Sequence, residues 1–325
     1  MKSITIISIT LIISGFLVSK TYAQGGFAGS FLRIGVGARA KAMGDAYTAL
    51  ARGIETSYYN PAGLPLLQHA EFMASFRVLA LDRRFTFLGF GVPIHPKIEK
   101  GEEGAIDGAF AISWIQARVG DIDGRDSDGR SIGEFSNSEN AFIFSFALNP
   151  VPALAFGLSV KVLLNRFPDI GINGQTLSST GVGFDFGVLL RPTDWLSLGI
   201  AIKDINSKYR WNTDKLYGED GSEVFNKFPK ILRLGTAVKV PKIRDLTLAF
   251  DFEDSEELDA RLHFGAEKIF KEGIVLRAGL DDQSITAGAG YQFDFLGKTS
   301  QLNYAFTAPG DRPEEEHIFT WVFQF

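Results

Sequence analysis

Apolar and polar side chains alternate with a period of two residues through most of the chain after residue 70. This period indicates β-strands with two chemically different faces, because successive side chains of a strand point to opposite sides. Each segment has 8 to 13 residues, and most are close to the roughly 9 to 11 residues that cross a bilayer at a tilt. We count fourteen segments, at residues 71–80, 83–94, 108–118, 139–149, 153–165, 180–190, 194–203, 231–240, 245–253, 260–269, 273–280, 284–292, 300–307 and 317–325.

The one long apolar stretch lies at the amino end, from Ile4 to Val18. It is shorter than the roughly 20 residues that a membrane-spanning helix needs, so a retained anchor is the weaker interpretation. With Lys2 before it and Thr21-Tyr22-Ala23 after it, the stretch predicts a signal peptide over residues 1–23, cleaved near Ala23. No later segment could span as a helix, so a membrane form of this chain must be a closed β-barrel.

The connections between the predicted strands differ in length. Short turns lie at 149–152, 191–193, 241–244 and 270–272, and long polar loops lie at 119–138, 166–179 and 204–230. Outer-membrane barrels show this arrangement, with short turns toward the periplasm and long loops outside. Two connections fit less well, the short one at Leu81-Asp82 and the long, charged one at 95–107.

The two faces of the predicted strands have different chemistry. The last strand places Phe319, Trp321, Phe323 and Phe325 on one side, which suits lipid. A cation at the bilayer midplane costs about 2 to 4 kcal/mol, so the charges on the opposite faces should point into the lumen. These predicted lumen charges are Lys161, Asp185, Arg233, Lys239, Asp251, Glu253, Arg261, Glu267 and Arg277.

The pattern as a whole predicts an all-β fold, a fourteen-stranded antiparallel transmembrane β-barrel over residues 71–325. The alternative is a soluble periplasmic β-sandwich or propeller, in which the same alternation separates core from solvent. Strand length, the even strand count and the outward aromatic residues of the last strand favour the barrel.

Residues 24–70 do not alternate, and they carry an alanine-rich stretch from Ala38 to Ala51. Small residues let a short helix approach other backbone closely, so we predict an N-terminal hatch of short helices in the lumen. Asn60 before Pro61 can cap and turn the chain, and Gly63 should supply a positive φ. A lumen cation such as Arg39 needs a carboxylate, for which Asp185, Asp251 and Glu253 are candidates.

Two motifs of this region resemble the start of the PorV/PorQ proteins, within the broader FadL-like barrels that include long-chain fatty-acid transporters. The motif residues are Gly37, Arg39, Met43 and Gly44 in the first, and Asn60, Pro61 and Gly63 in the second. The resemblance implies a hatch inside a fourteen-stranded barrel. It leaves open whether these residues only anchor the hatch or take part in gating.

Enzyme chemistry is not indicated by the sequence. The chain has no cysteine, its four histidines lack metal-ligand spacing, and neither a nucleophile elbow nor a phosphate loop occurs. We therefore expect no cofactor, and the net charge of −5 argues against a nucleic-acid partner. The one metal candidate is an acidic loop with Asp121, Asp123, Asp126 and Asp128, which could bind calcium or simply be a solvated surface loop.

The resemblance to PorV/PorQ proteins implies an accessory, non-enzymatic component of protein secretion or surface attachment of the type IX kind. It places the chain in the outer membrane of a Gram-negative bacterium, with membrane lipid and secretion-system or exported proteins as partners. The alternative is a FadL-like channel for long-chain fatty acids or other hydrophobic small molecules. An open aqueous porin ranks third, because a hatch and paired charges would fill a barrel of this size.

Overall fold

The structure is a computed structural model that describes residues 27–79, 82–96, 106–170, 174–310 and 314–325. The predicted signal peptide, Leu81 and most of the 95–107 connection lie outside the described residues. One antiparallel sheet contains sixteen strands. The strands are β1 Glu71–Leu79, β2 Arg83–Ile94, β3 Asp107–Arg125, β4 Ser131–Val151, β5 Leu154–Phe167, β6 Leu177–Thr193, β7 Leu196–Ile205, β8 Lys208–Asn212, β9 Glu223–Lys227, β10 Ile231–Lys239, β11 Leu246–Ser255, β12 Arg261–Ile269, β13 Ile274–Asp281, β14 Ser284–Phe295, β15 Lys298–Thr307 and β16 Glu316–Gln324.

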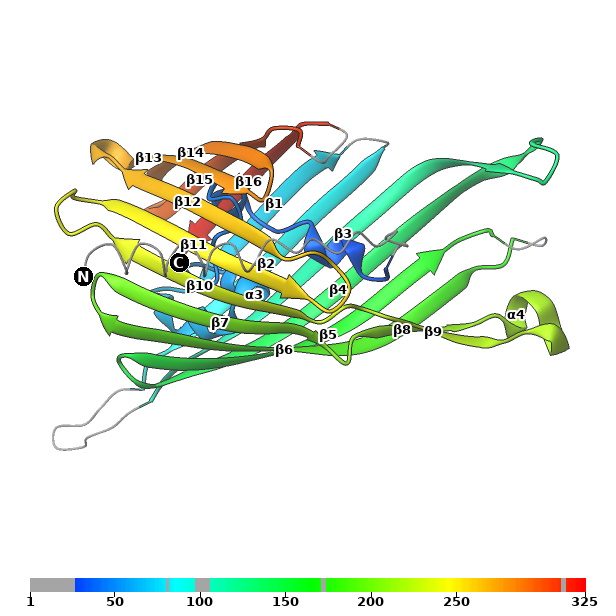
Figure 1. Ribbon diagram of the computed structural model, residues 1–325, viewed down its shortest axis with the longest axis horizontal. Helices are drawn as coiled ribbons and strands as arrows, with labels where there is room; N and C mark the ends of the chain where they lie inside the picture. The colour runs from blue at the N-terminus through cyan, green and yellow to red at the C-terminus, as the bar shows by residue number, and fades with distance from the viewer. Residues whose placement is uncertain (1–26, 80–81, 97–105, 171–173, 311–313) are drawn as a thin grey trace, which may run out of the picture.

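Fourteen of these strands close into a barrel (Figure 1), which confirms the predicted fold. The first strand pairs with the last, with Met73 opposite Val322, and β5 pairs with β6 along its whole length. The remaining strands, β8 and β9, form a hairpin that is added to the edge of β6 beyond its pairing with β7. Closure leaves no strand edge in the wall, as a protein in lipid requires.

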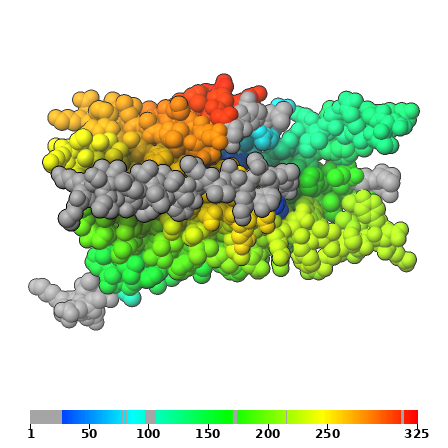
Figure 2. Space-filling model, viewed as in Figure 1, coloured from blue at the N-terminus to red at the C-terminus, as the bar shows by residue number. Residues whose placement is uncertain are grey.

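The predicted loops at 119–138 and 204–230 are wrong in part, because both contain strands. The β3–β4 hairpin continues past the barrel to a tip at residues 126–130. The second region holds the β8–β9 hairpin, with the short helices α4 (Asp214–Tyr217) and η3 (Gly218–Asp220) between its strands. Both extensions project from one end of the molecule, here called the hairpin end (Figures 1 and 2). Outside the bilayer both faces of a hairpin meet water, so a strand there need not alternate.

The predicted lipid-facing residues do face outward. Phe319 and Trp321 are 59% and 42% exposed, whereas Ile318 and Thr320 between them are buried. The opposite end of the barrel from the extensions is called the turn end, and it carries the tight connections at 152–153, 194–195, 240–245 and 296–297. The helix η4 (Lys271–Gly273) makes a further turn there.

The hatch, residues 27–70 of the described chain, lies inside the barrel (Figure 1). It consists of η1 (Ser30–Arg33), α2 (Ala38–Ala42), α3 (Thr56–Tyr59) and η2 (Pro61–Leu66), so helix covers less of 38–51 than the alanine content suggested. The main apolar core packs hatch residues such as Met43 and Tyr59 against wall residues such as Phe87. No helix within the described residues is long and apolar enough to cross a membrane.

We expect Phe250→Arg, on the outer face near the middle of β11, to destabilise the barrel by about 2 to 4 kcal/mol, because a cation would enter the bilayer core. Leu246→Arg lies on the same face at the turn end of the strand and should cost about 0 to 1 kcal/mol. Equilibrium unfolding in lipid vesicles measures both. Equal costs for the two variants would contradict the placement of this strand across the bilayer.

Candidate functional site: the hatch and its seat

Glycines on the inner face of the wall let the hatch backbone touch the barrel directly. A Cβ at Gly279 would lie 2.3 Å from Gly44 N, and one at Gly157 would lie 2.3 Å from Ala62 N. A Cβ at Gly199 would lie 2.3 Å from Thr48 O. Contacts this short are impossible for a side chain, so the wall is shaped to receive the hatch at three separate places.

Arg39 binds the wall through a carboxylate that the sequence did not single out for it. Its Nε and Nη2 donate to Glu267 Oε2 and Oε1 at 2.8 and 2.7 Å, and Arg277 Nε donates to the same carboxylate at 2.8 Å. The predicted partners Asp185, Asp251 and Glu253 are wrong for Arg39. Burial opposes the charge of Arg39, but Glu267 outweighs it and holds the pKa well above its ordinary value. A bidentate pair of this kind fixes both distance and orientation.

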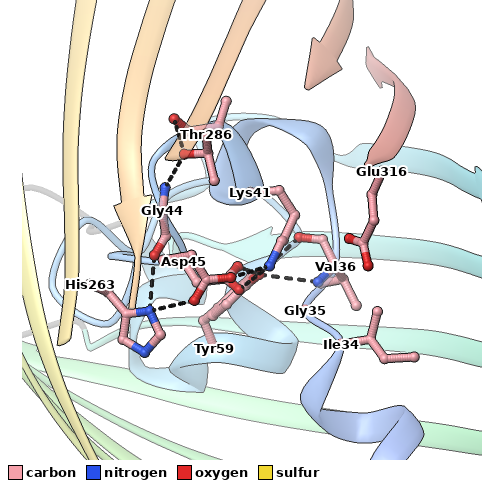
Figure 3. A network of polar contacts seen from close by, with 12 residues as sticks. Ile34, Gly35, Val36, Lys41, Gly44, Asp45, Tyr59, His263, Thr286 and Glu316 are labelled. Carbon is pink, nitrogen blue, oxygen red and sulfur yellow. Dashed lines mark hydrogen bonds and ion pairs between the residues drawn. The ribbon is translucent and has the colours of Figure 1, made fainter. Parts of the chain in front are cut away.

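A second polar network joins the hatch to β12, β13 and β14 (Figure 3). Lys41 Nζ lies 2.5 Å from Asp45 Oδ2 and 2.8 Å from Asp281 Oδ2. Tyr59 donates its hydroxyl to Asp45 Oδ1 at 2.6 Å. Burial works against ionisation of Asp45, but the positive charges of Lys41, Arg233 and His263 together outweigh it, so the pKa of Asp45 is lowered.

The ends of this network reach the wall on both sides of Gly44. His263 Nδ1 lies 2.9 Å from Gly44 O and 3.1 Å from Asp281 Oδ1, and Gly44 N donates to Thr286 Oγ1 at 3.1 Å. Met43, the other residue of this motif, packs in the core against Gly265. The motif therefore lies in direct contact with the wall on more than one strand.

The predicted lumen charges lie on the inner face, and most of them hold a partner. Lys161 pairs with Asp185 at 2.6 Å and also with Asp204. Arg233 pairs with Glu253. The carboxylate of Asp251 instead accepts backbone N–H groups of the hatch, from Tyr47 at 2.9 Å and Thr48 at 2.8 Å.

Two of the nine predicted lumen charges behave differently. Lys239 is exposed at the turn end of β10, and Arg261 is half-buried near the hairpin end of β12. Within the described residues, neither has a carboxylate within 4.0 Å. The other seven predicted lumen charges each hold a partner.

The second motif anchors the end of the hatch. Asn60 caps η2 by accepting from Ala62 N at 3.1 Å, as predicted, and its Nδ2 donates to Thr48 O at 2.8 Å and Val188 O at 3.1 Å. Pro61 opens η2. The positive φ predicted for Gly63 is wrong: a Cβ there would lie 2.5 Å from Ala51 O, so glycine is required for close approach.

Several residues that join the hatch to the barrel wall were not identified from the sequence. Lys41, Asp45 and Tyr59 stand within or beside the quoted motifs, and Asp281 follows directly after a predicted strand. Arg77 donates to Ile34 O at 3.0 Å and pairs with Glu316 at 3.1 Å. Its alternation with Met73 and Ser75 would have placed it on the inner face.

The four acidic residues of the predicted calcium loop do not form a metal site in the structure. Asp126 Oδ1 accepts backbone N–H groups of the β3–β4 tip, and Asp123 pairs with Arg125 at 2.6 Å. Asp128 lies 3.4 Å from Arg130, and Asp121 has a φ of 52° at a bulge. In the described part of the chain, no group of three or more His, Cys, Asp or Glu residues could hold a metal ion.

Two buried carboxyl groups lie where the hatch meets β1, and Glu71 Oε1 accepts from Ile54 N of the hatch at 2.7 Å. Glu55 and Glu71 are both buried, and a Cβ at Gly53 would lie 2.6 Å from Glu55 Oε2 and 3.1 Å from Glu71 Oε1. Burial first, and then the negative charge of Glu71, raise the pKa of Glu55 from 4.5 to about 7, while Arg39 and Arg277 act in the opposite direction. Glu55 therefore changes its charge near neutral pH.

Cavities remain on both sides of the hatch and outside the wall. The hairpin end has one of 480 Å³ lined by Phe27 and Phe228, and the turn end has two, of 600 and 460 Å³. On the lipid face a fourth cavity of 490 Å³ forms an apolar groove, called the wall groove. The wall groove is lined by Ala74, Phe76, Ile274, Ala289, Gly290, Tyr291, Leu302, Asn303, Tyr304, Phe319, Thr320 and Trp321.

Comparison with known proteins supports the fold and goes no further. No family model matches the sequence, and no curated protein matches it. Among solved structures, the CymD monoaromatic hydrocarbon channel aligns with a TM-score of 0.62 at 13% identity, over 92% of this chain and 99% of its own. The toluene transporter TodX of Pseudomonas putida aligns with a TM-score of 0.60 at 15% identity, over 90% and 99%. A FadL homologue of Pseudomonas aeruginosa aligns with a TM-score of 0.54 at 11% identity, over 84% and 94%.

We expect Glu267→Gln to loosen the hatch, because it leaves Arg39 and Arg277 buried without their shared carboxylate, at a cost of about 3 to 5 kcal/mol. Limited trypsin digestion at Arg39 and Lys41 measures release of the hatch. Glu256→Gln, which removes an exposed pair with Lys230, is the matched control and should change nothing measurable. Equal protection of all three proteins would contradict the role of Glu267.

We also expect the seating of the hatch to weaken with rising pH. Glu55 binds its proton more tightly when the hatch is seated than when it is released. Its contribution to the free energy of seating is therefore complete below pH 4.5 and is lost as the pH rises through about 7. Hydrogen exchange of residues 53–60 at pH 5 and pH 8 measures the effect. Glu55→Gln should remove the pH dependence, and a dependence that persists in this variant would assign it to another group.

Proposed function

We propose that this protein is an outer-membrane channel for hydrophobic small molecules, with the N-terminal hatch as its gate. The observation that carries the proposal is the hatch seated in a fourteen-stranded barrel whose fold matches the CymD and TodX channels over 90% or more of this chain. Turns would face the periplasm and hairpin extensions the outside, as in outer-membrane barrels. The signal peptide proposed for residues 1–23 would direct the chain there.

The occupied lumen argues against free diffusion of water-soluble solutes. The hatch core and its ion pairs stand between the cavity at the hairpin end and those at the turn end. A solute can therefore cross the lumen only when the hatch moves. A gate of this kind suits a substrate that binds to the protein before it crosses, whereas an open porin lets small solutes diffuse through freely.

The wall groove supports a hydrophobic cargo. It opens toward lipid, and the residues behind it touch the hatch: Thr320 Oγ1 accepts from Ala38 N at 2.8 Å. A Cβ at the neighbouring Gly288 would lie 2.5 Å from Ala42 Cβ, so α2 rests directly against this part of the wall. An apolar molecule in the groove would be separated from the hatch by a single layer of sheet.

Uptake by proteoliposomes tests the proposal. We expect saturable uptake of a fluorescent fatty acid, and Ala289→Trp should lower it several-fold because the indole fills the groove. Ala278→Trp, on the same outer face but outside the groove, is the matched control and should leave uptake unchanged. Absence of saturable uptake by the folded wild-type protein would reject the channel.

A second candidate is an accessory role in protein secretion or surface attachment, in line with the resemblance to PorV/PorQ proteins. The observation that favours it is exposed apolar surface on the two extensions, where Ile132, Tyr217 and Phe225 are 58%, 65% and 50% exposed. Trp211, by contrast, is partly buried and packs against Phe167 and Tyr209.

Affinity purification from native outer membranes separates the two candidates. An exported partner should be recovered with the wild-type protein and lost with Tyr217→Ser/Phe225→Ser. The matched control, Ile243→Ser/Leu296→Ser, removes exposed apolar residues at the turn end and should retain the partner. Equal recovery with both variants would exclude the extensions as the binding surface.

A further inference from the structure

The 460 Å³ cavity at the turn end carries an excess of positive charge. Four cations line it, Arg39, Arg52, Arg191 and Lys239, and two carboxylates, Asp194 and Glu267. We call it the basic chamber. Its cations come from the hatch, from the end of β6 and from the end of β10, which lie far apart in the sequence.

The carboxylates of the basic chamber do not balance its cations. Glu267 is already shared by Arg39 and Arg277, so Asp194 alone remains for the other three. Within the described residues, none of Arg52, Arg191 and Lys239 has a carboxylate within 4.0 Å. Arg191 Nη2 instead donates to a backbone carbonyl, Pro152 O, at 2.8 Å.

Two cations deeper in the lumen are balanced more fully. Lys41 and Lys161 each contact two carboxylates. A guanidinium group stays protonated at neutral pH, so crowding in the basic chamber cannot be relieved by loss of a proton. The pKa of Arg52 is lowered, first by burial and then by the nearby positive charge of Arg39. Arg191 lowers it further, and Glu267 offsets part of the change.

We propose that the basic chamber binds a phosphate group, which bridges Arg52 of the hatch to Arg191 and Lys239 of the wall. A tetrahedral anion offers oxygen atoms in several directions and accepts paired N–H groups from arginine. Two unpaired arginines and a lysine from three segments suit such a ligand better than a planar carboxylate, which one arginine can satisfy alone. This site does not depend on whether the protein carries a hydrophobic cargo.

The phosphate could belong to a soluble anion or to a phospholipid headgroup of the inner leaflet. The rim of the chamber includes Pro192 and Trp195, and Trp195 is 46% exposed at the turn end, where an aromatic side chain suits the membrane interface. Both sources present the same group to the same cations, so the chemistry of the site is common to them.

Isothermal titration of the delipidated protein in neutral detergent with inorganic phosphate tests the site. We expect saturable binding that Arg52→Gln/Arg191→Gln/Lys239→Gln weakens by about tenfold or more, because charge-assisted hydrogen bonds are lost. The matched control Lys242→Gln/Arg244→Gln/Lys271→Gln removes the same charge from exposed turns at the same end and should bind like the wild type. If the triple variant does not fold, Lys239→Gln alone should still weaken binding measurably.

The second arm identifies the source of the phosphate. Nanodiscs of phosphatidylglycerol and of phosphatidylcholine are compared, followed by native mass spectrometry of retained lipid. Retention of phosphatidylglycerol that competes with inorganic phosphate supports a headgroup, and phosphate binding that is equal in both lipids supports a soluble anion. Absence of phosphate binding and of lipid retention, or an equal loss in the control variant, would overturn the proposal.

Discussion

The bilayer does not hydrogen-bond to the backbone, and this constraint governs the rest of the molecule. Every N–H and C=O at membrane depth has to be paired within the protein, so the sheet must close on itself. Closure between β1 and β16 brings the two ends of the barrel sequence together. It also separates an outer face that can only be apolar from an interior where charge is permitted.

The interior uses that freedom to fix the hatch by charge. Arg39 and Lys41 come from the hatch, and their partners Glu267 and Asp281 come from neighbouring strands of the wall. A buried ion pair adds little net stability over apolar packing, but separating its partners without replacing them is expensive. The pairs therefore specify one position of the hatch, and any route through the lumen has to exchange them for other contacts.

The features that can be predicted from the sequence are those fixed by neighbouring residues or by the lipid around the barrel. Alternation locates the barrel strands because lipid enforces an apolar outer face, and it fails for the β3–β4 extension because water contacts both of its faces. The Asn60 cap is a contact between neighbours and is predictable, whereas Gly63 is fixed by Ala51, which tertiary structure brings close. Arg39 and Glu267 are 228 residues apart, and charge alone could not distinguish that carboxylate from the others on the inner face.

Most charges inside the barrel are paired, but cations outnumber carboxylates in the cavity between the hatch and the turn end. Arg39, Arg52 and Glu55 all line the cavities on that side, within one short stretch of the hatch. An anion between Arg52 and the wall would add an attachment to the seated hatch, while ionisation of Glu55 beside Glu71 would remove one. Both effects act on the segment that Arg39 anchors through Glu267. The groups proposed to change the attachment of the hatch by anion binding or by ionisation therefore lie on the turn-end side, whereas the exposed apolar side chains Ile132, Tyr217 and Phe225 lie on the extensions at the hairpin end.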